Sequence, residues 1–412
     1  PFSFCIIFGE DGKAGPSLGE NQYDDKKADI IKNARFAQIV YNANYQTFKA
    51  PDAPTVVATV EESSVRLYWS DNSLYSTDVV TGYSDFEGFR IYRSSDGGAT
   101  WGTEDDKIWD YDGNFVGWKP VAQFDLSEEE DQRHCVLGFE SFETCIEDDD
   151  GNNVCSNDET IQCRYDADCF ICKADKDDNE LRRDFPVLGP DPEAPWMSLG
   201  ENTGLDQIRN SDVPGFPFSY VDDNIIDGVE YSYTITAYDM GIKDLQTIST
   251  PVEGSEDLSS TSTVKVADPY DWYELGQFAS IENGLGNSIY NSHFVHVISG
   301  AGVDESMDDI KVVPNPYIAS NIYEGDNKWL RKIRFINLPS ECKITIFTIS
   351  GEQVFSMDYV KPEVCADNAD CGNNFWDLRS MNNQEVAPGL YFYVVEGKDN
   401  QKDFLGKFAI VR

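Results

Sequence analysis

Apolar and polar residues alternate along most of the last hundred residues of the chain. Ile333 and Phe335 alternate with polar residues in one run, and Ile344 and Ile346 do so in the next, which is the period of a strand with one buried face. A later segment, LYFYVVEG, is rich in aromatic and β-branched residues. The pattern predicts a β domain over residues 311–412, with the final GKFAIVR paired into its sheet.

A second alternating pattern follows a proline-containing linker near residue 51. Val65, Leu67 and Trp69 share one face of a predicted strand, and EYSYTITAYD forms a longer alternating run further along. We predict a β-sandwich over residues 51–252. Because such a sandwich needs only about 100 residues, the excess predicts an insertion at about residues 125–215.

Residues 1–50 change from a strand period to a helix period. The apolar run FSFCIIF at residues 2–8 predicts a strand without a visible hairpin partner. The residues of this strand that we expect to take part in assembly with another sheet are Phe2, Phe4, Cys5, Ile6, Ile7 and Phe8. This strand would complete the sheet of an upstream domain or add to the sheet edge of a neighbouring subunit. After Asp24, apolar residues follow one face of a helix: Ile30, Ala34, Ala37 and Tyr41. We expect residues 253–310 to be a linker with one or two strands packed between the domains.

The order of motifs in the chain resembles two known families. VVPNPY, FINLPSECKITIFTISGEQV, WDL, EVAPGLYFYVV and GKFAIVR resemble the C-terminal sorting domain of type IX secretion cargo, which has an immunoglobulin-like fold similar to that in the flagellar hook-capping protein. VKPEVCADNADCGNN departs from that pattern as an insertion. The segments APDAPTVVATVEESSVRLYWSDN, DFEGFRIYRSSDGGATW and YVDDNIIDGVEYSYTITAYDMG resemble a fibronectin type III domain.

The resemblances imply a fold and a cellular location. The expected fold is mainly β, with tandem immunoglobulin-like and fibronectin type III sandwiches, a disulfide-rich insertion and one N-terminal helix. The expected location is extracellular, at the outer cell surface, and the type IX secretion machinery is an expected partner. Such cargo needs a signal peptide that the sequence lacks, so we expect a mature or truncated product of a longer precursor.

The formal net charge is -42, and it is unevenly placed. Residues 311–412 are almost neutral, so nearly all of the excess lies in residues 1–310. Such a surface repels nucleic acid and anionic lipid and attracts cations. A solubilising surface and divalent-cation binding both account for it. The sequence has no apolar run long enough to span a membrane.

Most of the ten cysteines lie in the predicted insertion. A single CxxC pair without a second one at zinc-ribbon spacing favours disulfides over a metal cluster, as does the expected secretion. CRYDADC and CADNADC share a C-x5-C loop, for which pairing within each loop is one expectation. The disulfide candidates are Cys135, Cys145, Cys155, Cys163, Cys169, Cys172, Cys365 and Cys371.

The acidic insertion contains one calcium-like motif. Its oxygen-bearing side chains have the spacing of loop positions 1, 3, 5 and 12, which predicts calcium ligation by Asp148, Asp150, Asn152 and Glu159. A solvated acidic disulfide loop is the alternative, because Cys155 lies inside the motif and no helices flank it. Weaker candidates are Asp110 and Asp112, and the group Asp222, Asp223 and Asp227.

Nothing in the sequence predicts an enzyme. No HExxH, GxSxG, P-loop or dinucleotide-binding pattern is present. His293 and His296 lie three apart on a predicted strand, which sends them to opposite faces. Tryptophans offer either a carbohydrate platform or core packing: Trp69, Trp101, Trp109 and Trp118.

We therefore expect a self-assembling structural protein of the cell surface, a subunit of a filament, sheath or layer whose partners are other copies of itself. The alternative is a non-catalytic accessory region of a larger secreted enzyme or adhesin, with carbohydrate or surface binding. Calcium is the one cofactor that the sequence suggests.

Overall fold

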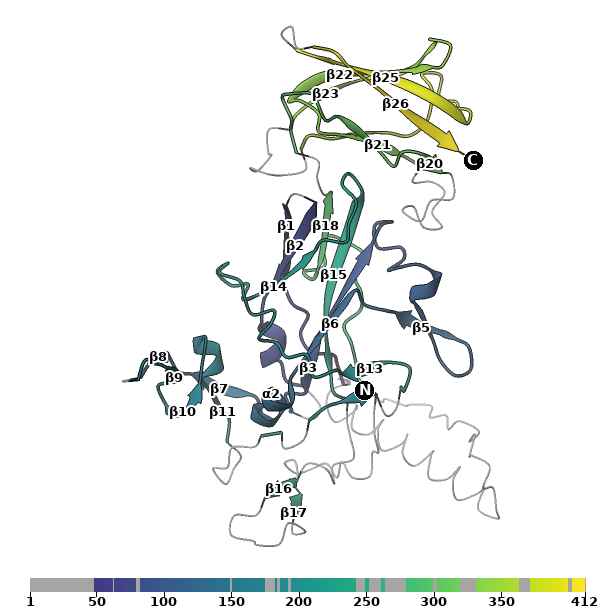
Figure 1. Ribbon diagram of the computed structural model, residues 1–412. Coiled ribbons are helices and arrows are strands. Elements are labelled where there is room, and N and C mark those ends of the chain that lie inside the picture. The colour runs from purple at the N-terminus through teal and green to yellow at the C-terminus, as the bar shows by residue number, and fades with distance from the viewer. Residues whose placement is uncertain are drawn as a thin grey trace, which may run out of the picture.

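The computed structural model describes most of the chain after residue 47. The described residues are 48–61, 63–78, 82–148, 150–174, 182–183, 186–191, 194–241, 249–251, 261–263, 279–298, 302–318, 331–362, 371–398 and 402–411. The predicted N-terminal strand and helix lie outside them. The described part is mainly β and forms two sandwiches, one above the other in Figure 1.

The first sandwich consists of two sheets with the orders β1-β2-β14 and β18-β15-β3-β6. Their strands are β1 (Val56–Glu61), β2 (Ser64–Trp69), β14 (Phe218–Asp222), β18 (Phe294–Ile298), β15 (Glu230–Asp239), β3 (Phe86–Ser94) and β6 (Ala122–Asp125). The alternating residues Val65, Leu67 and Trp69 are fully buried, as their period predicts. Trp69 contacts the rings of Phe89 and Phe218 in the core.

One strand lies outside the range predicted for this sandwich. β18 pairs with β15 from Glu230↔Ile298 to Thr234↔Phe294 and forms an edge of the four-stranded sheet. The sequence assigned this strand to a linker whose strands pack between the domains, whereas β18 belongs to the sheet of the first sandwich and its Ile298 also packs against Ile336 of the second. The physical reason is burial: Phe294, Val297 and Ile298 are covered only when the strand closes this sheet.

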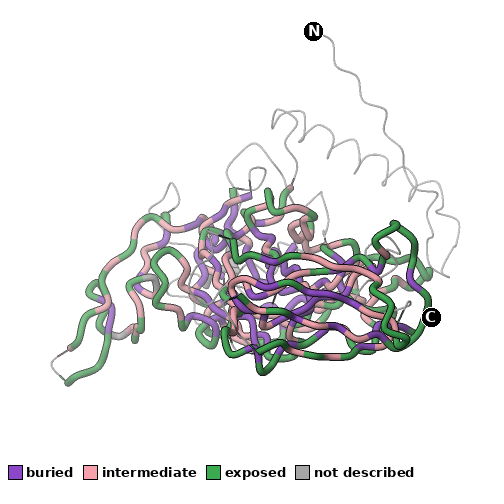
Figure 2. Tube along the Cα trace, turned by 90° about the horizontal axis from the view of Figure 1, so that it is seen from above, coloured by how far each residue is buried: buried purple, intermediate pink, exposed green. Residues whose placement is uncertain are grey.

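A hairpin and a larger arm project from the sandwich (Figure 1). The hairpin is β4 (Lys107–Trp109) with β5 (Phe115–Trp118). The arm contains small sheets and one short helix: α2 (Glu128–Arg133), β7 (Phe139–Phe142), β8 (Cys145–Glu147), β9 (Asn153–Cys155), β10 (Asp158–Gln162) and β11 (Phe170–Cys172). Figure 2 shows that most of the tip of this arm is exposed or intermediate, whereas buried residues gather inside the sandwiches.

The remaining short elements connect or flank these parts. They are the 3-10 helices η1 (Asn72–Tyr75), η2 (Glu104–Asp106) and η3 (Asp166–Asp168), and the strand pairs β12 (Gly189–Pro190) with β13 (Ser198–Gly200) and β16 (Ser249–Pro251) with β17 (Thr261–Thr263).

The second sandwich comprises residues 302–411 of the described chain. Its three-stranded sheet has the order β19-β21-β24 and its five-stranded sheet the order β20-β26-β25-β22-β23. The strands are β19 (Lys311–Val313), β20 (Tyr317–Ile318), β21 (Ile333–Ile336), β22 (Glu341–Thr348), β23 (Gln353–Val360), β24 (Asn374–Trp376), β25 (Gly389–Gly397) and β26 (Phe404–Val411). The prediction that the final residues pair into a sheet is confirmed, since β26 lies between β25 and β20.

The two sandwiches meet in a packed junction. Ile298 of β18 packs with Ile336 of β21, and Val313 of β19 covers them. Gly228 precedes β15 with φ +80°, and a Cβ there would lie 2.8 Å from Cγ2 of Ile336. The backbone of one domain thus approaches the side chains of the other so closely that only glycine fits without a shift.

Candidate functional site

The best candidate for an interaction site is the outer edge of the second sandwich. β23 ends the five-stranded sheet, where it pairs with β22 from Glu341↔Val360 to Phe347↔Gln353. The Lys361 amide donates to the Ser340 carbonyl on the β22 side, and the Val354 carbonyl accepts from the Met381 amide on the other side.

Because backbone groups alternate in direction along a strand, these two bonds identify the outward-facing groups of β23. They belong to Ser356, Asp358 and Val360. No described residue forms a backbone hydrogen bond with them on the outer side. An edge with unpaired N–H and C=O groups is a template for another strand.

A groove with aromatic side chains and a polar rim lies next to this edge, and its polar lining residues are Asp377, Arg379, Ser380 and Asn383. It has a volume of about 370 Å³ and lies between β23, β24 and the turn after β24. Phe355 stacks on Trp376 at its floor with 5.9 Å between ring centroids. Phe375 and Met381 line the same groove and remain 53% and 66% exposed. An incoming strand would therefore find both backbone partners and apolar side chains to cover.

The insertion is held together by three disulfides. They are Cys135–Cys172, Cys145–Cys163 and Cys155–Cys169. Pairing of Cys163 with Cys169 inside its C-x5-C loop was therefore wrong. The physical reason is that η3 separates the two cysteines and the small β8-β9-β10 sheet brings more distant partners into contact. Cys371 is also disulfide-bonded, and Cys365 lies outside the described residues.

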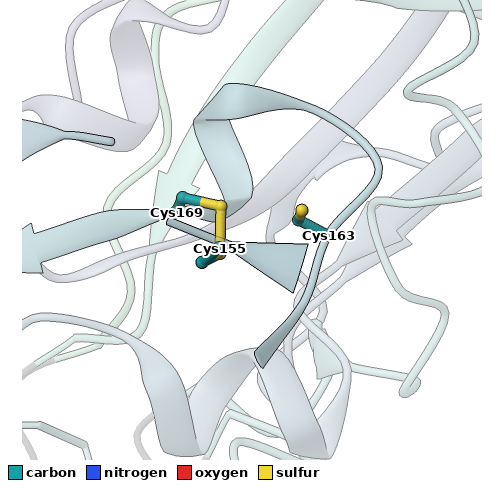
Figure 3. A group of neighbouring side chains, drawn as sticks. All are labelled: Cys155, Cys163 and Cys169. Atoms are coloured by element: carbon teal, nitrogen blue, oxygen red, sulfur yellow. A yellow bond between two sulfur atoms is a disulfide. The ribbon is translucent and has the colours of Figure 1, made fainter. Parts of the chain in front are cut away.

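Two of these disulfides are neighbours. The sulfur atoms of Cys155, Cys163 and Cys169 lie within 4.8 Å of one another, which is the spacing of a metal site. Figure 3 shows the bond between Cys155 and Cys169 with the Cys163 sulfur beside it. Because Cys163 is bonded to Cys145, this trio consists of oxidised sulfurs, and thiolate ligation is not available to it.

A buried ionic cluster joins the insertion to the first sandwich. The Arg183 guanidinium donates to Glu87 at 2.7 Å and to Asp131 at 2.5 Å, and all three side chains are almost inaccessible to solvent. Burial raises the pKa of Glu87 well above its ordinary value, although the Arg183 charge opposes the rise. Burial likewise raises the pKa of Asp131. The cluster therefore depends on its single arginine.

The predicted calcium residues lie around the β8–β9 hairpin. Asp148 accepts hydrogen bonds from the Asp150 amide at 2.9 Å, the Asn152 amide at 2.7 Å and the Asn152 side chain. Glu159 belongs to β10 and does not share the hydrogen bonds that gather around the Asp148 carboxylate. The hairpin is thus shaped by an aspartate turn, and calcium ligation here remains a prediction.

The weaker candidate pair has the same local structure. Asp110 accepts from the Asp112 amide at 2.9 Å and from the Asn114 amide at 2.7 Å, in the turn between β4 and β5. Both loops have the sequence D-x-D-G-N, so this pattern encodes a hairpin turn in this chain. Asp222 has a different role, because its carboxylate forms an ion pair with Arg93 at 2.8 Å.

The tryptophans divide between core and surface. Trp69 is in the core, Trp101 is buried against Tyr92 and Phe294, and Trp109 is 48% exposed. On the β4–β5 hairpin, Phe115 contacts both Trp109 and Trp118 edge to face. A row of aromatic rings thus follows this hairpin.

The histidines have structural contacts. His134 is buried, and burial together with the Arg183 charge lowers its pKa well below the ordinary value. His293 lies 2.8 Å from the Gly284 carbonyl, whereas His296 lies 2.6 Å from Glu230. The two therefore have separate environments, in agreement with their spacing.

Glu230 is the polar centre of the junction between the sandwiches. Its carboxylate accepts from His296 of the first domain and from Lys332 and Arg334 of the second. Burial acts to raise the pKa of Glu230, but the hydrogen bonds from His296 and Lys332 outweigh it and hold the pKa well below its usual range. Sequence patterns contain no signal for this cluster, because its members come from both domains.

The N-terminal assembly candidates Phe2, Phe4, Cys5, Ile6, Ile7 and Phe8 lie outside the described residues. The edge that would receive such a strand was not predicted. Its strand is visible in the alternation of QVFSMDYV, but whether a strand is central or peripheral depends on the order of the whole sheet.

Comparisons with known proteins give no family. No family model matches the chain, and no curated protein matches it. Among solved structures it is similar to PorZ, a surface component of the type IX secretion system of Porphyromonas gingivalis, with 10% identity, a TM-score of 0.21, and coverage of 89% of this chain and 39% of that one.

Two further solved structures match with similarly low identities and TM-scores. The FN1–FN3 domains of chicken CNTN1 have 9% identity, a TM-score of 0.17, and coverage of 88% and 67%. Latent dimeric PorU from Porphyromonas gingivalis has 13% identity, a TM-score of 0.18, and coverage of 89% and 34%. The chain thus spans less than half of PorZ and PorU, and at these TM-scores the likeness carries no argument about function.

The class that the described fold defines is a β-sandwich protein with disulfides in an inserted arm. In the described part of the chain, no helix combines the length and apolar character needed to cross a membrane. Disulfides are typical of proteins in oxidising compartments, which agrees with a secreted or surface location.

Proposed function

We propose that this chain is a structural subunit of an extracellular bacterial surface assembly, exported by type IX secretion, whose copies join at the edge of the second sandwich. The observation that carries the proposal is the outward-facing backbone of Ser356, Asp358 and Val360 beside a groove that exposes Phe375 and Met381. Main-chain hydrogen bonds at a sheet edge supply affinity, and neighbouring side-chain pockets supply specificity.

Two features suit such a role. The junction at Glu230 and Gly228 fixes one sandwich against the other, so a contact at β23 would orient the whole subunit. The disulfides of the arm stabilise a region with few apolar residues, each by roughly 2–4 kcal/mol.

The test replaces Ser356 by proline. Proline removes one outward N–H while keeping the bonds that β23 makes to β22, because edge strands tolerate proline where the N–H faces solvent. Ser356→Ala is the matched control, since it removes the same hydroxyl and keeps the N–H. Negative-stain electron microscopy and sedimentation velocity of the full chain measure assembly.

We expect ordered polymers for the parent chain and for Ser356→Ala, and dispersed particles for Ser356→Pro with an unchanged melting temperature. Polymers that persist in Ser356→Pro would refute assembly at this edge. Dispersed parent chains across all protein concentrations would refute the structural-subunit proposal itself.

A second function is favoured by the β4–β5 hairpin. Trp109 and Phe115 are about half exposed. Tyr111 is 82% exposed, and its ring contacts that of Trp196 edge to face. Exposed aromatic rings on a fixed hairpin suit an accessory region that binds carbohydrate or another surface. Saturable glycan binding that is lost in Trp109→Ala, but kept in a substitution at the buried Trp101 that preserves folding, would support this function.

A further inference from the structure

The geometry at β23 also points to the segment that binds there. Resting on the proposed assembly at this edge, we infer that the uncharged run Phe2–Phe8 of a second copy adds as a strand next to β23. The run and the edge match in length, alternation and charge.

Length is the first point of agreement. With respect to the described residues, the open part of β23 extends from Ser356 to Val360, because the Met381 amide already donates to the Val354 carbonyl. A run of the length of Phe2–Phe8 spans this part with a residue to spare at each end. Its own N–H and C=O groups would then pair with the three outward-facing residues of the edge.

The alternation of the run matches the two faces of the sheet. Along β23, Phe355, Met357 and Tyr359 point toward the core, and Ser356 and Asp358 point to the outer face. In the run, Phe2, Phe4, Ile6 and Phe8 share one face, and Ser3, Cys5 and Ile7 share the other. With the phenylalanines toward the groove, the smaller Ser3 and Cys5 fall on the outer face.

The groove is suited to the aromatic face of the run. Phe355, Phe375 and Met381 present apolar surface that described residues leave partly uncovered. Burying large aromatic side chains there removes apolar area from water on both partners. A shift by one residue would turn all four large residues to the outer face, so only registers that differ by an even number of residues place them on the core side of β23.

Charge is consistent with the same partner. Residues 1–310 carry nearly all of the excess negative charge, and most of their segments would be repelled by a second copy. The run Phe2–Phe8 has no charged residue, and the second sandwich is almost neutral. The negative charge of Asp358 at the centre of the edge would repel an acidic strand, but it would not repel an uncharged one.

The register makes a covalent test possible. Cys5 on the outer face of the added strand would neighbour residues 356 and 358, so Asp358→Cys and Ser356→Cys are each within reach of it. Cys342 does not interfere, because it is buried on β22 and burial raises the pKa of its thiol to about 12. Lys343→Cys is the matched control, since it lies on β22, directly across from Asp358 and one strand further from the added one.

The experiment mixes two tagged full chains under mild oxidation. One carries Cys5 with the native edge, and the other carries Asp358→Cys with Cys5→Ser. We expect a disulfide between the differently tagged chains, at least tenfold more than with Lys343→Cys, and peptide mapping should assign it to Cys5. A chain that carries both Cys5 and Asp358→Cys is analysed alongside for an internal disulfide.

Each other outcome overturns the inference. In the chain with both thiols, an internal disulfide from Cys5 to the cysteine introduced at position 358, without an intermolecular one, would mean that the run covers its own edge. Absence of cross-linking at both 356 and 358, with assembly still lost in Ser356→Pro, would mean that another strand binds and that only the identity of the partner is wrong. Assembly that is insensitive to Ser356→Pro would remove the proposed function as well.

Discussion

Replacing Arg183 by methionine should destabilise the first sandwich and its arm more than any other single arginine substitution in the insertion. The variant leaves Glu87 and Asp131 without their shared cation, and both carboxylates are fully inaccessible to solvent. Removing one partner from a buried ion pair costs about 3–5 kcal/mol, because the remaining charge has lost its hydration and its counter-ion.

That loss corresponds to a large change in melting temperature. A change of 1 kcal/mol shifts the midpoint by about 2–4 °C in a domain of 150–250 residues, so Arg183→Met should lower it by roughly 6–20 °C. Differential scanning calorimetry with the disulfides oxidised measures the shift and separates the transitions of the two sandwiches. Only the transition of the first sandwich should move.

The loss should also depend on pH. Burial already raises the pKa values of Glu87 and Asp131, and removing Arg183 raises them further. A carboxyl group with a raised pKa in the folded state binds protons more readily there than in the unfolded chain, so stability falls as pH increases. The variant should therefore lose more stability at pH 8 than at pH 5.

The matched control is Arg164→Met. Arg164 belongs to the same insertion but is exposed, with its guanidinium over the ring of Tyr165, so its loss should stay within about 0.5 kcal/mol. Two results would refute the conclusion that this buried cluster depends on its arginine. One is a change in the unfolding free energy of Arg183→Met below about 1 kcal/mol, and the other is a larger loss of unfolding free energy at pH 5 than at pH 8.

Three other contacts lead to predictions of their own. The variant Cys135→Ser, which breaks the bond to Cys172, should cost about 2–5 kcal/mol and expose the arm to limited proteolysis, while an unchanged cleavage pattern would contradict this. Burial and a neighbouring aspartate raise the pKa of Asp85 to about 7, so unfolding free energy should fall as pH rises from about 4 to 7, and Asp85→Asn should show a shallower fall in denaturant titrations. Gly228→Ala should push its new Cβ against Ile336 and change the angle between the sandwiches, which small-angle scattering would report as a changed distance distribution, whereas an identical curve would show that the junction yields without reorientation.

The local patterns of the chain predicted its strands well. Val65, Leu67 and Trp69 alternate in the sequence and point into one core, because a strand with one buried face needs an apolar residue at every second position. The six clustered cysteines likewise indicated disulfides, and the prediction is confirmed for three pairs. Such signals are short-range, so a single sequence contains them.

Signals that depend on distant partners were missed or misassigned. β18 was assigned to a linker, because its membership of the first sandwich depends on β15, which is far away in the chain. The sequence left the pairing of Cys163 open, with Cys169 as one candidate partner, and the small sheet brings it to Cys145 instead. The spacing of Asp148, Asp150, Asn152 and Glu159 predicts calcium ligation, which stays a prediction, and the structure adds that the Asp148 carboxylate shapes a turn.

By itself, the sequence determined the mainly β fold, the disulfide-rich character of the insertion and the uneven charge, since each depends on composition and on the period of neighbouring residues. Only the tertiary structure decided which strand lies at the edge of its sheet, which cysteines bond, and how Arg183 and Glu230 gather their partners. Those features arise when residues remote in the chain compete for the same buried space, and no local pattern records the result of that competition.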